Sequence, residues 1–222
     1  MSCAVPVARL AKFVAGLIFP AGLILVLVAG AELFTGNCLM VMAAAEGKIN
    51  LPQLLRSWVV VYVGNLAGGV LVACLISLSG QLGASALRDF TVKVASNKIA
   101  LSFGNAFVLG LLCNWLVCLA VWSSFAAKDV AGKIFAVFFP IWLFVASGFE
   151  HSVANMYYIP AGIFASGGEV VGLTWSAMFT KNLLPVTLGN IVGGAVFVGM
   201  AYLMAYRTKS LGVRSEGLGV RS

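Results

Sequence analysis

The sequence predicts an all-α integral membrane protein with an inverted internal repeat and two broken helices. Three observations lead to this prediction. First, 61% of the 222 residues are hydrophobic and only 9% are charged, whereas soluble domains carry roughly 25% charged residues. Second, apolar stretches of about 20 residues, the length that crosses a hydrocarbon core, recur along the chain. Third, one glycine-rich phrase occurs twice. A water-soluble fold is therefore excluded.

Five membrane-spanning segments follow one another along the chain. We place them at about residues 10–30, 53–80, 98–126, 131–163 and 181–206. The first segment is longer than a signal peptide and no cleavage pattern follows it, so it is interpreted as part of the fold. Residues 1–206 are expected to form one membrane domain. Residues 207–222 are polar and contain Leu-Gly-Val-Arg-Ser twice, which predicts a disordered tail.

Polar residues interrupt the first and the fourth of these regions. Residues 31–37 read Ala-Glu-Leu-Phe-Thr-Gly-Asn, and residues 148–155 read Gly-Phe-Glu-His-Ser-Val-Ala-Asn. A short apolar piece follows each interruption, so each predicts a broken helix with a half-helix after the break. Non-helical backbone at membrane depth is tolerated only where protein or a wet cavity satisfies its peptide groups. The two breaks therefore mark the interior of the bundle.

The repeated phrase relates two halves of the chain. Gly-Asn-Leu-Ala-Gly-Gly-Val at 64–70 matches Gly-Asn-Ile-Val-Gly-Gly-Ala at 189–195. Small residues also allow close helix packing for its own sake, but the matching order favours a duplication. The last three spans form a plain helix, a broken helix and a helix with the phrase, and the first two lack the plain helix. We therefore expect this chain to carry five of the six spans of a complete duplication. Truncation, an internal start or a gene-model error would each account for the missing span.

Charge and motif content exclude several classes. The formal charge is +7, but the basic residues flank the apolar segments rather than forming an aromatic-rich patch, so nucleic-acid binding is not expected. Eight basic residues on the side of the C-terminus against six on the other favour a cytoplasmic C-terminus in the cell membrane. The five cysteines are dispersed, and metal, nucleotide and nucleophile motifs are absent, so we expect no metal, no cofactor and no enzyme.

His151 is the only histidine and lies in the second break beside Glu150. An ionisable group inside a membrane is costly, so a function is the default hypothesis, with a satisfied core histidine as the alternative. Imidazole can donate a hydrogen bond to an anion or pass it a proton. Glu150, Asn155 and the matching Glu32 at the first break are expected to be structural. The glutamates would accept hydrogen bonds from broken backbone, with a transport role as the alternative for Glu150.

Four further polar residues are candidates for an anion path. Thr35 and Asn37 lie beside the start of the first half-helix, where unpaired N–H groups favour anions, although they can also act as ordinary caps. Lys98 is expected to begin the third span and to attract anions at the pore mouth, or else to be an interfacial lysine. Asn114 can line the path or bind a neighbouring helix.

Four segments together closely resemble the formate/nitrite transporter family. They are residues 31–37, Cys-Asn-Trp-Leu-Val-Cys-Leu-Ala-Val-Trp at 113–122, residues 146–156 and Asn-Leu-Leu-Pro-Val-Thr-Leu-Gly-Asn at 182–190. The resemblance covers about residues 8–206. It implies six spanning helices in an aquaporin-like inverted repeat and homopentamers with one pore in each subunit. We expect this chain to depart from that pattern in lacking the first helix.

The resemblance also implies roles for individual residues. Thr35 belongs to the loop that breaks the second family helix, His151 is the central pore histidine with Asn114 as its neighbour, and Lys98 matches the vestibule lysine. Three residues that are otherwise ordinary core positions match the constrictions on the two sides of the histidine, and they are Leu23 and Phe19 on one side and Phe144 on the other.

The predicted function is passage of small monovalent anions of weak acids across the membrane, by a channel or by symport with a proton. Formate leads, and nitrite and hydrosulfide remain open. A bare ion would pay a large desolvation cost at an apolar constriction, which hydrogen bonding or proton transfer from His151 would reduce. The alternatives are a truncated, non-transporting membrane subunit and a channel for neutral solutes such as glycerol, which Lys98 and His151 fit less well.

Overall fold

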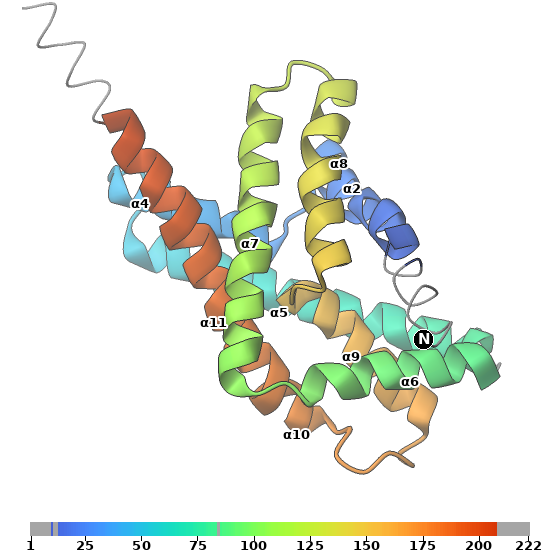
Figure 1. Cartoon of the computed structure of the whole chain (residues 1–222). Coiled ribbons are helices and arrows are strands. Elements are labelled where there is room, and N and C mark those ends of the chain that lie inside the picture. Colours follow the sequence, from blue (N-terminus) through green and yellow to red (C-terminus); the bar gives the residue numbers. More distant parts are fainter. Residues whose placement is uncertain (1–9, 11–12, 84, 208–222) are drawn as a thin grey trace, which may run out of the picture.

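The computed structural model describes residues 10, 13–83 and 85–207, and the elements in these ranges are helical (Figure 1). They are α2 (Pro20–Ala29), α3 (Phe34–Asn37), η1 (Cys38–Met40), α4 (Val41–Ala45), α5 (Leu51–Leu78), η2 (Gln81–Gly83), α6 (Ser85–Ile99), α7 (Phe103–Ala126), α8 (Val130–Ser147), α9 (Ser152–Ser166), α10 (Trp175–Ala177), η3 (Met178–Leu183), α11 (Leu184–Ile191) and η4 (Val192–Met200). The predicted tail from residue 208 onward lies outside the described residues.

The predicted spans are present. Within the described ranges, four helices are long and apolar enough to cross a membrane, and their bounds are Leu51–Leu78, Phe103–Ala126, Val130–Ser147 and Trp175–Arg207. The segments Phe13–Ala29 and Phe34–Ala45 form a bent pair, which counts as a fifth span if the two segments cross the membrane as one unit. The chain is therefore a multi-pass membrane protein, as hydropathy predicted.

Both predicted helix breaks are confirmed. Gly30 ends α2 with a φ of 74°, and Gly148 ends α8 with a φ of 73°, a left-handed conformation that glycine adopts at little cost. The chain then runs for a few residues without helical hydrogen bonds before α3 or α9 begins. At the first break the two helical segments are bent by 62°. Each half of the chain therefore brings one irregular segment into the bundle.

The third span begins later than predicted. Lys98 lies in the last turn of α6, a helix that hydropathy did not predict because its charged residues break the apolar run. The side-chain oxygen of Ser102 accepts a hydrogen bond from Asn105 N–H, and this cap starts α7 at Phe103. The prediction that Lys98 begins the spanning helix was therefore wrong, since it precedes that helix by one short turn.

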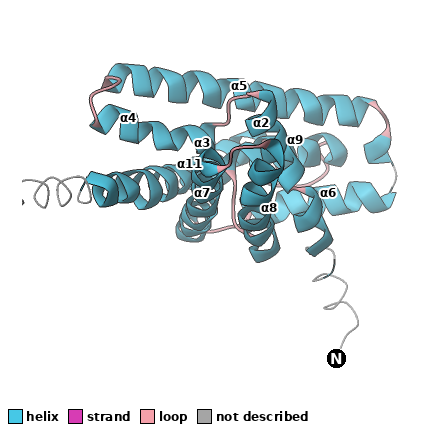
Figure 2. Ribbon diagram, turned by 90° about the horizontal axis from the view of Figure 1, so that it is seen from above, coloured by secondary structure: helices cyan, strands magenta, loops and turns pink. Residues whose placement is uncertain are grey.

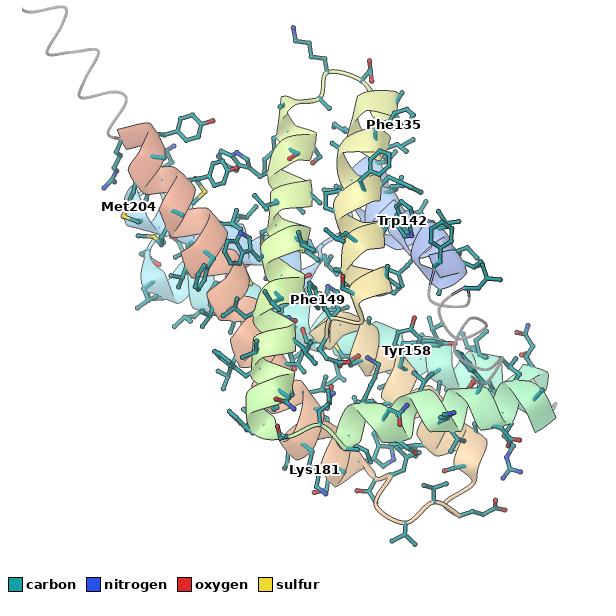
Figure 3. All side chains as sticks on the ribbon, in the orientation of Figure 1. Phe135, Trp142, Phe149, Tyr158, Lys181 and Met204 are labelled. Carbon is teal, nitrogen blue, oxygen red and sulfur yellow. The ribbon has the colours of Figure 1, made fainter. Side chains whose placement is uncertain are left out.

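α7 lies at the centre of the bundle, packed against α8, α11 and η4 (Figure 1). Its inward face is made of small or fully buried side chains, including Ala106, Cys113, Asn114 and Cys118. Large apolar side chains such as Phe135 on α8, which is 67% exposed, point outward instead (Figure 3). A polar and small-residue interior inside an apolar shell is the pattern of a helical membrane protein.

Candidate functional site

His151 lies at the end of the second break and caps α9. Its Nδ1 atom accepts a hydrogen bond from Ala154 N–H at 3.0 Å, and its Nε2 atom lies 2.9 Å from the hydroxyl oxygen of Thr35. Because Nδ1 accepts, the neutral ring carries its proton on Nε2. The imidazole is therefore held so that Nε2–H is the group it can donate.

Thr35 brings the first break to the same point. It is fully buried on α3, and its backbone oxygen accepts hydrogen bonds from Asn114 Nδ2 at 3.1 Å and from Cys118 Sγ at 3.3 Å. The hydroxyl is left for His151. Thr35 and His151 are 116 residues apart in sequence, and the contact between their side chains thus joins the regions of the two breaks.

An apolar cavity of about 330 Å³ borders His151, and we call it the central cavity. Its lining residues are Phe19, Gly22, Leu23, Val26, Leu33, Val117, Ile141, Phe144, His151, Val153 and Ala154. Phe144 stacks on the His151 ring with centroids 5.9 Å apart, and Phe19 meets Phe144 edge to face at 5.4 Å. His151 is the one ionisable side chain in this lining, and the positive end of the α9 helix dipole lies beside it.

A second cavity of about 340 Å³ lies on the other side of Leu23. Leu23, Val26 and Leu33 line both cavities, so these three side chains separate them. Glu32 and Asn37 supply the ionisable and amide groups of the second cavity, and Asn37 Nδ2 donates to Glu32 Oε2 at 2.5 Å. One of the two amide hydrogens of Asn37 thus goes to this carboxylate.

Lys98 pairs with Glu150 behind His151. The Nζ atom lies 2.9 Å and 3.1 Å from the two carboxylate oxygens, with the lysine side chain 15% exposed and the glutamate side chain 8% exposed. Asn155 Nδ2 donates to the same carboxylate at 2.7 Å and Asn182 Nδ2 at 3.3 Å. Neither member of the ion pair lines the two cavities described above.

The broken backbone is held by two asparagines that the sequence interpretation missed. Asn190 accepts from Ser152 N–H at 2.9 Å and donates to Glu150 O at 3.1 Å. Asn65 repeats this pattern at the first break, where it accepts from Phe34 N–H at 3.0 Å and donates to Glu32 O at 3.1 Å. Both belong to the repeated glycine-asparagine phrase, which was the available signal.

The expected role of the two glutamates therefore needs correction. Their carboxylates bind side chains, namely Lys98, Asn155 and Asn182 for Glu150 and Asn37 for Glu32, rather than the broken backbone. A carboxylate offers only acceptors, whereas an asparagine amide can serve a free N–H and a free carbonyl together. Each break presents one group of each kind, which is why an amide suits it.

Asn114 is fully buried and binds its neighbours instead of lining either cavity. Its Nδ2 atom donates to Thr35 O at 3.1 Å and to Asn190 O at 2.6 Å. This matches the helix-binding alternative. Within the described residues there is also no group of three or more His, Cys, Asp or Glu side chains that could hold a metal ion.

Tyr62 and Thr187 mark where the two halves meet. Their hydroxyl oxygens are 2.9 Å apart, and they are separated by 125 residues, the same interval that separates Asn65 from Asn190. Residues at equivalent places in the two repeats therefore touch each other. A contact of this kind lies on the pseudo-twofold axis that the duplication predicts.

Comparison with known proteins identifies the family. The model of the formate/nitrite transporter family matches residues 1–204. A probable formate transporter of Methanothermobacter thermautotrophicus is 45% identical over 215 residues, covering 90% of this chain and 77% of that protein. The formate channel FocA of Haemophilus influenzae is 43% identical, covering 90% and 76%. A solved pentameric formate channel with formate bound superimposes with a TM-score of 0.81 at 39% identity, covering 89% and 84%. The chain belongs to the formate/nitrite transporter family.

Proposed function

We propose that this chain carries small monovalent anions of weak acids, formate first among them, through a pore inside each subunit. The observation that carries the proposal is the central cavity, which is apolar except for the donor of His151 and the first turn of α9. The relatives named as formate channels and transporters support formate as the substrate. Nitrite and hydrosulfide have the same charge and similar size and belong to the same test.

The proposed path runs through the two cavities, past Leu23. Phe19, Leu23 and Phe144 form the constriction and exclude bulk water from the central cavity. A dehydrated anion there would pay a desolvation cost of several kcal/mol. The Nε2–H of His151 and the hydroxyl of Thr35 offset this cost by donating toward the anion, and the positive end of the α9 helix dipole adds a favourable field.

The hydrogen-bond pattern favours donation by a neutral imidazole over proton transfer from it. To give up the Nε2 proton, the ring would first need a proton on Nδ1. That nitrogen faces the Ala154 N–H, so protonating it would break the cap of α9 and set two donors against each other. The anion therefore crosses hydrogen-bonded to His151 while Thr35 releases Nε2–H.

Lys98, Glu150 and Asn155 have a supporting role in this proposal. Their network fixes the segment that carries His151, and the carboxylate balances the lysine charge, so the field at the cavity is weaker than an unpaired lysine would produce. Asn37 and Glu32 hold the opposite break in the same way.

We place the protein in the cell membrane as a homopentamer with its C-terminus in the cytoplasm. The solved relative described as pentameric supports the assembly. The outer face of α8 carries Phe135, Phe139 and Leu143, all exposed and about one turn apart, which suits lipid or a neighbouring subunit. The charge count of the loops supports the orientation.

The test is formate uptake by proteoliposomes that contain the full chain. The variant His151→Phe keeps a ring of similar size and removes the donor, so uptake should fall strongly. The matched control is Thr180→Ala, which removes an exposed hydroxyl bonded only to its own helix at Ser176 O. Uptake that is absent from the unmodified chain would favour the non-transporting subunit. Glycerol passage faster than formate passage would favour the neutral-solute channel.

A further inference from the structure

The helix that carries Thr35 is too short to fix its own position. α3 has four residues, and at Cys38 the chain changes from α3 to the 3-10 helix η1. A helix of this length makes few hydrogen bonds of its own. Figure 2 shows α3 between α5 and α7, and it packs against both. Side chains of these two long helices therefore decide where the Thr35 hydroxyl lies.

Side chains of α5 hold the two ends of α3. Asn65 accepts a hydrogen bond from the N–H of Phe34, the first residue of α3. Trp58 Nε1 donates to the carbonyl oxygen of Asn37, the last residue, at 2.9 Å. Neither bond involves Thr35, which lies between these two ends.

Two side chains of α7, one helical turn apart, hold Thr35 itself. Asn114 Nδ2 donates to the carbonyl oxygen of Thr35 at 3.1 Å, and Cys118 Sγ donates to it at 3.3 Å. A carbonyl oxygen has two lone pairs and can accept from both. Asn114 is shared, because its amide also donates to Asn190 O at 2.6 Å. The thiol of Cys118 is the other side chain that ties α7 to this carbonyl.

Cys118 has little room to move away from Thr35. Its side chain is fully buried. A Cβ atom added at Gly194, on the last span, would lie 2.7 Å from Cys118 Sγ and 2.8 Å from Cys38 Cβ, closer than such atoms can approach. The thiol therefore fills a tightly packed space between the last span and α3, and its place is set by packing as well as by its hydrogen bond.

We infer that Cys118 is a positioning residue of the anion path and acts through Thr35. The inference rests on the proposed function, in which the Thr35 hydroxyl and His151 Nε2–H are the donors to the anion. Cys118 lines neither of the two cavities described above. The carbonyl that it binds and the hydroxyl that faces His151 belong to the same residue, so a shift of the carbonyl moves the hydroxyl. Loss of the thiol therefore weakens the 2.9 Å contact between Thr35 and His151.

The contact can be observed directly, because His151 is the only histidine of the chain. Nitrogen NMR of the full chain with isotope-labelled histidine records the Nε2 resonance, which responds to its hydrogen bond. Thr35→Val gives the resonance that Nε2 has without the hydroxyl. We expect Cys118→Ala to move Nε2 toward that position, and Cys118→Ser, which keeps a donor, to leave it close to that of the unmodified chain.

The matched control is Cys113→Ala, which removes another fully buried thiol of α7, one without a hydrogen bond to Thr35. It should leave the Nε2 resonance in place. An Nε2 resonance that is unchanged in Cys118→Ala, or that Cys113→Ala moves equally, would overturn the inference.

Formate uptake by proteoliposomes tests the link to transport. Cys118→Ala should lower uptake about threefold, the effect of one hydrogen bond of modest strength, and Cys118→Ser should restore it. In a chain that already carries Thr35→Val, Cys118→Ala should cause no further loss, because its effect passes through the missing hydroxyl. A further loss there would overturn the inference. An unmodified chain without formate uptake would count against the proposed function, and the NMR comparison would still decide whether Cys118 positions Thr35.

Discussion

The ion pair between Lys98 and Glu150 gives a prediction whose size follows from the structure. Replacing Lys98 with Met leaves the Glu150 carboxylate with Asn155 and Asn182 as its remaining donors, in a site where its side chain is only 8% exposed. Removing one partner of a buried pair costs about 3–5 kcal/mol. The two amide donors stabilise the unpaired carboxylate, and the 15% exposure of the lysine side chain shows that water can approach the pair. We therefore expect Lys98→Met to lower the free energy of unfolding by about 3 kcal/mol, at the low end of this range.

Replacing Glu150 with Gln should lower the free energy of unfolding by less than Lys98→Met does. The lysine keeps some access to water, and its Nζ atom lies 5.5 Å from the centre of the Tyr158 ring, a cation–π distance. Glutamine also retains an oxygen that accepts from Asn155 or Asn182. The double variant removes both charges together, so its cost should be lower than the sum of the two single costs by about 1–3 kcal/mol.

The assay is equilibrium unfolding in a single detergent for the unmodified chain, both single variants and the double variant. The matched control is Lys48→Met, which removes a lysine paired with Glu46 on the surface, where such pairs contribute little to stability. Strictly additive costs for Lys98→Met and Glu150→Gln would refute the view that the two residues act as one buried unit.

Three further predictions concern the breaks, the repeat and the pore. Asn190→Ala should destabilise the protein more than Asn65→Ala in thermal unfolding. Asn190 is fully buried and bonds three backbone groups, and each of these groups costs about 1–3 kcal/mol when it is left unpaired. Equal losses of stability in the two variants would contradict this. Gly193→Ala should lower the free energy of unfolding by about 1–3 kcal/mol, because the added methyl group overlaps α7. Gly68→Ala should leave it unchanged or raise it. The reverse order of the two variants would be inconsistent with the packing. Thr35→Val should lower formate flux about tenfold, the loss expected for one hydrogen bond to a charged group. It should also cost about 1–3 kcal/mol in the free energy of unfolding, because it leaves the buried Nε2–H of His151 without its partner. An undiminished flux would remove Thr35 from the path.

Hydropathy predicted the spans well because each depends on the composition of one continuous segment. The predicted 53–80 became α5 at Leu51–Leu78, and both breaks were placed because polar residues and a glycine interrupt an apolar run. Helix α6 was missed, since its 15 residues include several charged ones and have neither the length nor the apolarity of a span. The early start of the last span, at Trp175, depends on a cap from Thr174 that hydropathy does not register.

The site was predictable only where one residue carries its own signal. His151 is such a residue, as the single histidine at membrane depth. The partners of Lys98 were not predictable, because the lysine meets Glu150 across 52 residues and only the folded chain brings them together. The roles of Asn65 and Asn190 depend on backbone groups that become free when the helices break, which a sequence pattern alone does not reveal.

The central claim is that an anion crosses the central cavity as a charged species hydrogen-bonded to His151. It is tested most directly by formate-dependent current across a planar bilayer that contains the full chain, recorded at fixed voltage and pH for the unmodified protein and for His151→Phe. The account predicts a formate current in the unmodified protein and its loss in the variant. Formate uptake without any current, or a current of equal size in the variant, would contradict it.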